Sequence, residues 1–178
     1  GFRDEMPSPL VLDMAIHTFD AARYLMRADP VSVYCEEYNP KWSWYKGSAS
    51  AVAFFEMSGG TRYDYRGSWC AEGLPTSWEA EWRAIGSQGT AIWNGHSDIR
   101  AERMGQTADG FMHEGQQLVG DVEEGRPSGI SGALVEFLHA LDTGETPQGE
   151  CHDNIKSLAM VFGAIESARE GRRVTISI

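Results

Sequence analysis

The fold is decided by residues 49–69, which read ASAVAFFEMSGGTRYDYRGSW. β-Branched and aromatic residues fill both halves, and the Ser-Gly-Gly turn at 58–60 predicts a hairpin of strands over 49–57 and 61–69. In the second strand, aromatic positions alternate with charged ones: Tyr63, Tyr65 and Trp69 against Arg62, Asp64 and Arg66. Successive side chains point to opposite faces of a strand. One face is therefore predicted to be covered by helices, and the other to be polar and either wet or in contact with a partner.

The same kind of reasoning extends outward to the rest of the chain. Strands are predicted over 31–38, 79–85, 90–93, 98–104 and 174–178, and helices over 11–27, 131–143 and 153–170. The turn at 86–89 predicts a second hairpin, and residues 105–129 lack periodicity and predict a long excursion. Strands that follow one another directly favour antiparallel pairing. We predict an α+β fold with a largely antiparallel, open-faced sheet of about six strands and helices packed on one face.

Length and charge restrict the class of protein. A chain of 178 residues predicts one domain, 1–178, with a sizeable core. The net charge of −11 repels phosphate groups and anionic lipid, so neither nucleic acid nor a membrane is an expected partner. The three cysteines, Cys35, Cys70 and Cys151, are odd in number and widely spaced. They indicate reduced thiols, with burial favoured over metal binding, and hence a cytoplasmic protein.

Three polar residues are spaced for one face of the first helix. Asp13, His17 and Asp20 lie at positions i, i+4 and i+7, which are neighbours on a helix. A carboxylate one turn from a histidine can hold its ring in one tautomer and make it a better base. The alternatives are a solvated polar strip or a divalent metal site, since histidine with carboxylates suits several metals. We predict no metal, because a single helix rarely completes a ligand set.

Other parts of the sequence bear on binding. There is no G-x-G-x-x-G turn and no phosphate-binding P-loop, so this chain does not build a nucleotide site by itself. Trp69 and Trp78, with Trp42 and Trp44, lie around two predicted loops, where indoles could stack on sugar rings. A core or interface position is an equally good interpretation of these tryptophans.

Three segments together carry a family resemblance. Residues 12–20, LDMAIHTFD, resemble the DxGxHxxD helix of the Gfo/Idh/MocA oxidoreductases. The hairpin WRAIGSQGT at 82–90 is similar to the I-x-G-x-x-G-T strand pair of that family, and residues 133–176 are similar to its closing element. Two departures are Ala15, where glycine is common, and Pro7–Leu10 in place of a glycine-rich approach to the motif.

The resemblance covers the C-terminal half of the family and implies a function. Members usually begin with a Rossmann domain bearing a Glu-Lys-Pro motif, and neither is present in this sequence. The chain would then be the substrate-binding and catalytic domain of an NAD(P)-dependent oxidoreductase acting on a secondary alcohol of a sugar or polyol. NAD or NADP would be bound mainly by the missing domain. A homodimer or homotetramer would form through the open face of the sheet.

The resemblance also assigns roles to residues. His17 would take the hydroxyl proton, while Asp13 would hold the imidazole and touch a substrate hydroxyl. Asp20 is expected to be structural, by pairing with Arg23 or capping a loop, rather than to act in catalysis, and is kept with Trp69 and Trp78 as a candidate substrate-binding residue. As an isolated chain, without the hydride acceptor and the lysine, the domain is expected to be inactive.

Two other functions remain open. A relative that uses bound NAD for transient oxidation during glycoside cleavage would retain its cofactor without exchange. A stand-alone carbohydrate-binding or oligomerisation domain would bind its ligand with no dependence on nicotinamide.

Overall fold

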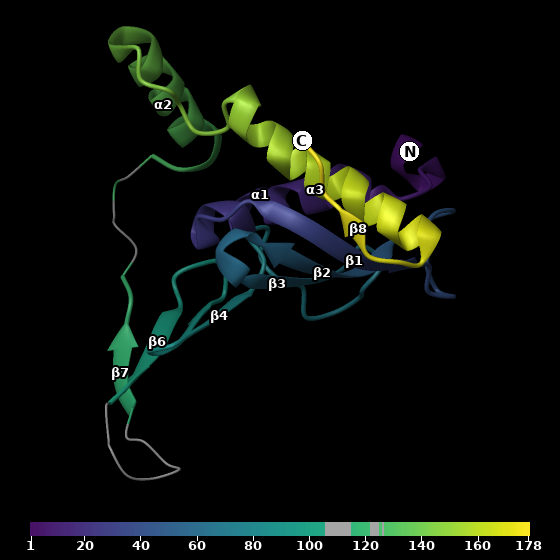
Figure 1. Cartoon of the computed structure of the whole chain (residues 1–178), viewed down its shortest axis with the longest axis horizontal. Coiled ribbons are helices and arrows are strands. Elements are labelled where there is room, and N and C mark those ends of the chain that lie inside the picture. The colour runs from purple at the N-terminus through teal and green to yellow at the C-terminus, as the bar shows by residue number, and fades with distance from the viewer. Residues whose placement is uncertain (106–114, 122–124, 126) are drawn as a thin grey trace. The chain divides into compact units, whose positions relative to one another are not determined.

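The computed structural model describes residues 1–105, 115–121, 125 and 127–178 (Figure 1). The chain forms two compact units, the first comprising residues 1–72 and 140–178 and the second residues 73–139. Within the described residues, none of the helices combines the length and the apolar character that a bilayer crossing requires.

The first unit is built on a four-stranded antiparallel sheet in the order β3-β2-β1-β8. Its strands are β1 (Pro30–Tyr38), β2 (Ser50–Met57), β3 (Arg62–Ser68) and β8 (Val174–Thr175). The predicted hairpin over 49–69 is confirmed, with Phe55 of β2 opposite Tyr63 of β3 and a single 3₁₀ turn, η3 (Ser58–Gly60), between the strands.

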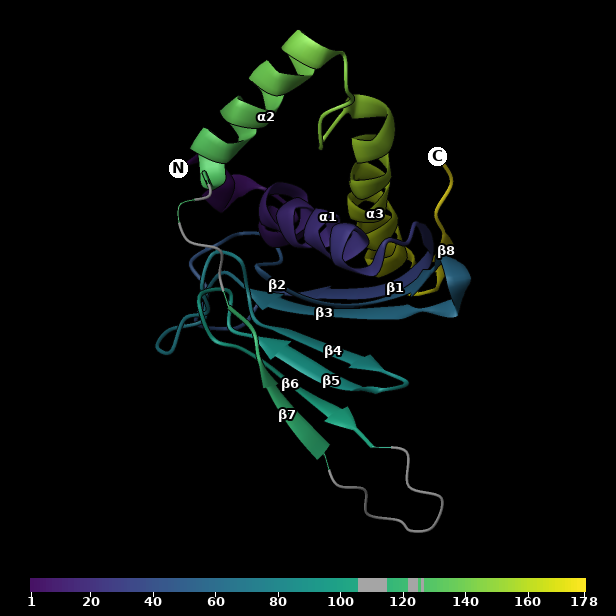
Figure 2. The same ribbon diagram turned by 90° about the vertical axis from the view of Figure 1, so that its left-hand side faces the viewer.

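Helices cover one face of this sheet (Figure 2). They are η2 (Leu10–Met14), α1 (Ala15–Met26) and α3 (Cys151–Glu170), and a short 3₁₀ helix, η1 (Phe2–Glu5), precedes them in the chain. Phe19 of α1 packs edge-on against Phe55 at 4.9 Å and against Tyr65 at 5.2 Å between ring centroids. Tyr63 and Tyr65 are buried, whereas the charged residues that alternate with them are exposed. The predicted two-faced character of β3 is confirmed.

Capping contacts set the ends of these helices. α1 ends at Met26 because Arg27 adopts a left-handed conformation with φ of 48°. α3 begins two residues earlier than predicted. The carboxylate of Glu150 accepts a hydrogen bond from the backbone N–H of His152, and Gly171 ends the helix in a left-handed conformation. Asp153, a residue type that often caps helices, lies inside α3, and its carboxylate accepts a hydrogen bond from Arg23 of α1.

The second unit contains a separate antiparallel sheet in the order β4-β5-β6-β7. Its strands are β4 (Trp82–Gly86), β5 (Gly89–Trp93), β6 (Ile99–Met104) and β7 (Gly115–Val119). The hairpin at 86–89 is confirmed. β7 lies inside the stretch that the sequence predicts to be irregular, and it pairs with β6. The remainder of that predicted excursion includes residues 106–114, 122–124 and 126, which lie outside the described residues.

The α+β class and the antiparallel pairing are therefore confirmed, but the strands are divided between two sheets of four. The buried apolar side chains of the described residues all belong to the first unit. The helix α2 (Gly129–Thr143) contains no buried residue, and Phe137 on it is 53% exposed. The cysteines are free thiols. Cys35 and Cys70 are buried as predicted, and Cys151 is exposed, contrary to the prediction.

Candidate active site

The helix that carries Asp13 and His17 starts with a turn wider than an α-helical one. Residues Leu10–Met14 form a π-helical turn, and the backbone N–H of Ala15 bonds to the carbonyl of Leu10, five residues earlier. Regular α-helix follows from Ala15 onward. Such π turns occur frequently at functional sites. Asp13 therefore sits in the π turn and His17 in the first turn of α1.

Asp13 forms an ion pair that the sequence analysis did not predict. Its Oδ2 accepts a hydrogen bond of 2.7 Å from Nε of Arg3, and its side chain is 24% exposed. The guanidinium of Arg3 also lies 4.7 Å from the ring centroid of Phe2. The bond to Asp13 raises the pKa of Arg3 above its ordinary value. No motif links two residues ten positions apart, so only the folded chain could reveal this pair.

His17 is exposed on α1, so its imidazole can be reached from solvent. Asp20, by contrast, is directed toward α3. Its Oδ1 accepts a hydrogen bond of 2.6 Å from Oγ of Ser157 and lies 3.5 Å from Nη1 of Arg23. The predicted pairing of Asp20 with Arg23 is confirmed. The two carboxylates of the motif therefore have different environments, one next to Arg3 and the other against α3.

The side chains that lie close enough together to hold a metal ion, within the described residues, are not those of α1. Within the described part of the chain, possible ligand atoms of Glu150, Cys151 and His152 lie within 4.8 Å of one another, whereas Asp13, His17 and Asp20 form no such group. Hydrogen bonds from the backbone and side chain of His152 lower the pKa of Glu150 to about 2. The contacts of Glu150 are those of a helix cap, and the positive end of the α3 dipole disfavours a cation there.

The loop between β1 and β2, residues 39–49, which we call the aromatic loop, lies against the chain segment that leads to Asp13. Backbone hydrogen bonds join Lys46 to Asp4 at 2.8 Å and Ser48 to Pro7 at 2.9 Å. Gly47 makes this approach possible, since a Cβ there would lie 2.1 Å from the carbonyl oxygen of Met6. The loop is therefore fixed to residues 4–7, just before η2.

The predicted tryptophans lie in different environments. Trp69, directly after β3, is half-buried and stacks on Tyr45 of the aromatic loop with 5.8 Å between ring centroids. Trp42 donates from Nε1 to the carbonyl of Cys70 at 3.1 Å and, with Ala71 and Glu72, lines a hollow of about 460 Å³. Trp78 is 67% exposed and belongs to the second unit.

Comparison with known proteins decides the family. The GFO/IDH/MocA C-terminal domain model matches residues 2–92, about half of the chain and the part that contains η2, α1 and the first hairpin. The chain belongs to this family. A curated relative, the uncharacterized protein y4oX of Sinorhizobium fredii, is 32% identical over 182 residues, covering 98% of this chain and 49% of the relative. The chain thus spans about half the length of the curated relative that it matches.

Solved structures share the fold of this chain over nearly its whole length. An oxidoreductase from Agrobacterium radiobacter, in complex with NAD+, L-tartaric acid and magnesium, has a TM-score of 0.79 at 22% identity and covers 98% of this chain and 51% of that protein. An aldose-aldose oxidoreductase from Caulobacter crescentus, complexed with glycerol, has a TM-score of 0.71 at 20% identity, covering 93% and 47%. A levoglucosan dehydrogenase in complex with NADH and L-sorbose has a TM-score of 0.75 at 12% identity, covering 99% and 53%.

Proposed function

We propose that this chain is the substrate-binding and catalytic domain of an NAD(P)-dependent oxidoreductase that acts on a secondary alcohol of a sugar or polyol. The observation that carries the proposal is the exposed His17 one helical turn from Asp13, which is held by Arg3. Neutral imidazole next to a fixed carboxylate is suited to accept a proton from an alcohol. The names of the similar structures, which include complexes with NAD+, NADH, glycerol and L-sorbose, support the same reaction class.

The chain's own residues would perform the proton half of the reaction. The alcohol O–H bond breaks, its proton moves to a nitrogen of His17, and its electron pair forms the carbonyl of the product. A bound nicotinamide supplies the acceptor for the hydride that leaves the same carbon. The dinucleotide would be held mainly by another domain, because the glycine-rich turn that cradles its phosphates is absent from this sequence. Trp69, which belongs to the same unit as His17, is proposed to contact the substrate.

The test uses the natural polypeptide that carries this chain, assayed against polyols with NAD and NADP. His17→Ala is expected to lower kcat by about 10²–10⁴-fold and to leave nicotinamide binding unchanged. The matched control is His96→Ala, which removes another exposed histidine from the second unit. Asp13→Asn is expected to cause a smaller loss and to displace the pH–rate profile. Unaltered turnover in His17→Ala would remove His17 from the mechanism.

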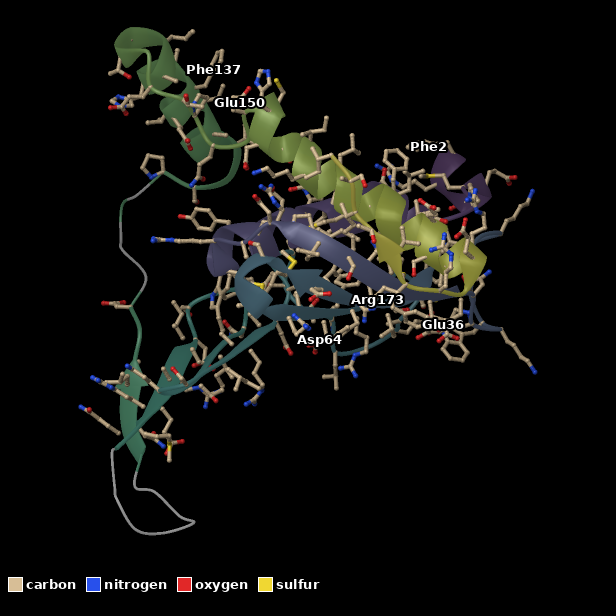
Figure 3. The ribbon with its side chains drawn as sticks, viewed as in Figure 1. Phe2, Glu36, Asp64, Phe137, Glu150 and Arg173 are labelled. Carbon is tan, nitrogen blue, oxygen red and sulfur yellow. The ribbon has the colours of Figure 1, made fainter. Side chains whose placement is uncertain are left out.

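The open face of the first sheet supports the proposal of a homodimer or homotetramer. Tyr34, Val52 and Phe54 are 43%, 45% and 38% exposed on the face opposite the helices. Charged residues of both signs surround them, including Glu36 and Asp64, and the guanidinium of Arg173 lies 5.6 Å from the ring of Phe54 (Figure 3). A face with both signs of charge can be complementary to a second copy of itself under two-fold symmetry.

Sedimentation measurements test this interface directly. Phe54→Glu places an extra charge in the middle of the apolar patch and is expected to yield monomers. Tyr24→Glu is the control, because Tyr24 is 66% exposed on α1, away from this face. An unchanged sedimentation coefficient in Phe54→Glu would show that the face is not the interface.

The hollow lined by Trp42 favours a second candidate function, carbohydrate binding without catalysis. An exposed indole next to the carboxylate of Glu72 offers a stacking surface and a hydrogen-bond acceptor for a sugar ring. Sugar titrations followed by tryptophan fluorescence, with and without nicotinamide, distinguish the two functions. Binding that is independent of nicotinamide and is abolished by Trp42→Ala, but not by His17→Ala, would favour the binding module.

A further inference from the structure

Arg23, near the end of α1, is buried among polar groups from three parts of the chain. Its side chain is only 6% exposed, which is exceptional for an arginine. Its terminal nitrogens reach four side chains: Ser157 at 2.8 Å, Asp153 at 2.8 Å, Asp29 at 3.3 Å and Asp20 at 3.5 Å. Asp20 belongs to α1, Asp29 to the connection before β1, and Asp153 and Ser157 to α3.

A second cation completes this group, which we call the Arg23 cluster (Asp20, Arg23, Asp29, Asp153, Lys156 and Ser157). Lys156 donates to Asp29 at 2.9 Å and lies 3.4 Å from Asp153, so two cations face three carboxylates. Hydrogen bonds from Lys156 and Arg23 lower the pKa values of Asp29 and Asp153. Nε of Arg23 is buried and has no hydrogen-bond partner among the described residues.

Burying an arginine is an expensive way to join two helices, since apolar side chains of similar volume often give equal or greater stability. The guanidinium differs from them in being directional. The N–H groups of the planar guanidinium point in fixed directions. They meet acceptors on a partner helix only when that helix has one rotation about its axis and one position along it. Asp153 and Ser157, one turn apart on α3, contact the two terminal nitrogens of Arg23 separately. The Arg23 cluster therefore fixes both the rotation of α1 about its own axis and its position along α3.

The rotation of α1 determines where the motif residues point. His17 lies three residues before Asp20 on the same helix, and Asp20 is held by the hydroxyl of Ser157 at 2.6 Å. We propose that Arg23 is a positioning residue, which sets the direction of the His17 imidazole by fixing α1 against α3 through Asp20, Asp153 and Ser157. Asp20 then serves the contact between α1 and α3 rather than the substrate. The kinetic consequence rests on the function proposed above.

Small displacements of a catalytic base have large effects, since a misplacement of about 1 Å can cost on the order of 10²-fold in rate. Arg23→Met removes the fork while it keeps the volume and the apolar stem. We expect kcat per folded molecule to fall by about 10- to 100-fold, while KM for nicotinamide stays within about two-fold of its original value. Arg23→Lys keeps the charge without the fork and should recover only part of this loss.

Two further variants separate positioning from general instability. Ser157→Ala leaves every charge in place and should reduce kcat to a smaller extent, again without a change in nicotinamide KM. Arg169→Met removes an exposed arginine of α3, whose side chain is 73% accessible, and should leave kcat unchanged. The folded fraction of each variant is counted from the protected amides of β2, which belongs to the core of this chain. If Arg23→Met matches Arg169→Met in kcat per folded molecule, the proposal is overturned.

Amide hydrogen exchange gives a measurement that does not depend on activity. In Arg23→Met, amides of α1 should exchange faster than in the unmodified polypeptide, while those of β2 keep their protection. If the natural polypeptide shows no nicotinamide-dependent activity, the proposed function fails, yet faster exchange confined to α1 would still support the structural role of the cluster. Unchanged exchange in α1 would reject that role whatever the activity.

Discussion

The two sheets of this protein are built from the same local elements and differ in what covers them. In β2 of the first sheet, alternate residues are fully buried, from Ala51 through Phe55 to Met57, under α1 and α3. In β4 of the second sheet, no residue is buried, and Ile85 is 79% exposed. Both sheets contain tight antiparallel hairpins. Hairpin pairing therefore forms a sheet in either unit, but a core arises only where apolar helices lie on it.

The largest expected effect comes from removing the helix side chain at the centre of that core. Phe19→Ala should lower the free energy of unfolding of the first unit by about 3–5 kcal/mol, because a large buried ring leaves a cavity. Ile85→Ala, in the second unit, should change the free energy of unfolding of that unit by no more than about 0.5 kcal/mol, because the Ile85 side chain is exposed. Urea unfolding followed by circular dichroism measures both variants. Equal losses would break the distinction between the two units.

A smaller loss of stability is expected from substituting a glycine of the first unit, and a glycine of the second unit provides the control. Gly47→Ala should destabilise the first unit by about 1–3 kcal/mol, because its Cβ would meet the backbone of residues 6 and 7. Gly86→Ala is the matched control, since the nearest atom to its Cβ would be 3.8 Å away. Urea midpoints of the two variants provide the comparison. A stable Gly47→Ala variant would mean that the aromatic loop can move away from the N-terminal segment.

The Arg23 cluster predicts how acid affects the first unit. The pKa of Asp153 is lowered in the folded state from its ordinary value of 3.8, so its contribution to stability is present above that value. This contribution is lost as the pH falls through the lowered pKa. Asp153→Asn should therefore reduce the urea midpoint most above pH 5, with the difference shrinking below pH 4. A difference that did not depend on pH would show that the charge of Asp153 is not responsible.

The smallest expected effect has the opposite sign. Glu37 lies on the inner face of β1, and burial raises the pKa of its carboxyl group despite a hydrogen bond from Ser8. A raised carboxyl pKa costs stability at pH values above it, because the folded protein must then bury a charge. Glu37→Gln should thus raise the urea midpoint slightly at pH 7 and leave it unchanged near pH 4. A lower midpoint at pH 7 would indicate that the charge is needed.

Much of the local structure could be predicted from the residue pattern. The hairpin at 58–60 and the alternation along β3 depend on neighbours within a few positions, and both are confirmed. The helix predicted over 11–27 is regular α-helix only over Ala15–Met26, after a π turn over Leu10–Met14. The sequence did not predict β7, because Gly115–Val119 lack the apolar alternation of a half-buried strand. Four of these five residues are exposed in the structure, so the strand has no buried face that would require such a pattern. The start of α3 was predicted two residues too late, because Asp153 is a good cap by type but binds Arg23 instead.

The sequence by itself determined the helices, most of the strands and the placement of Asp13, His17 and Asp20 along one helix, because hydrogen-bonding periods of two and 3.6 residues act over short stretches. Only the tertiary structure decided the partners of these residues. Arg3 binds Asp13 from ten residues away, and Ser157 binds Asp20 from 137 positions further along the chain. It also decided the division into two sheets. Such contacts depend on how whole elements pack, which no local pattern encodes.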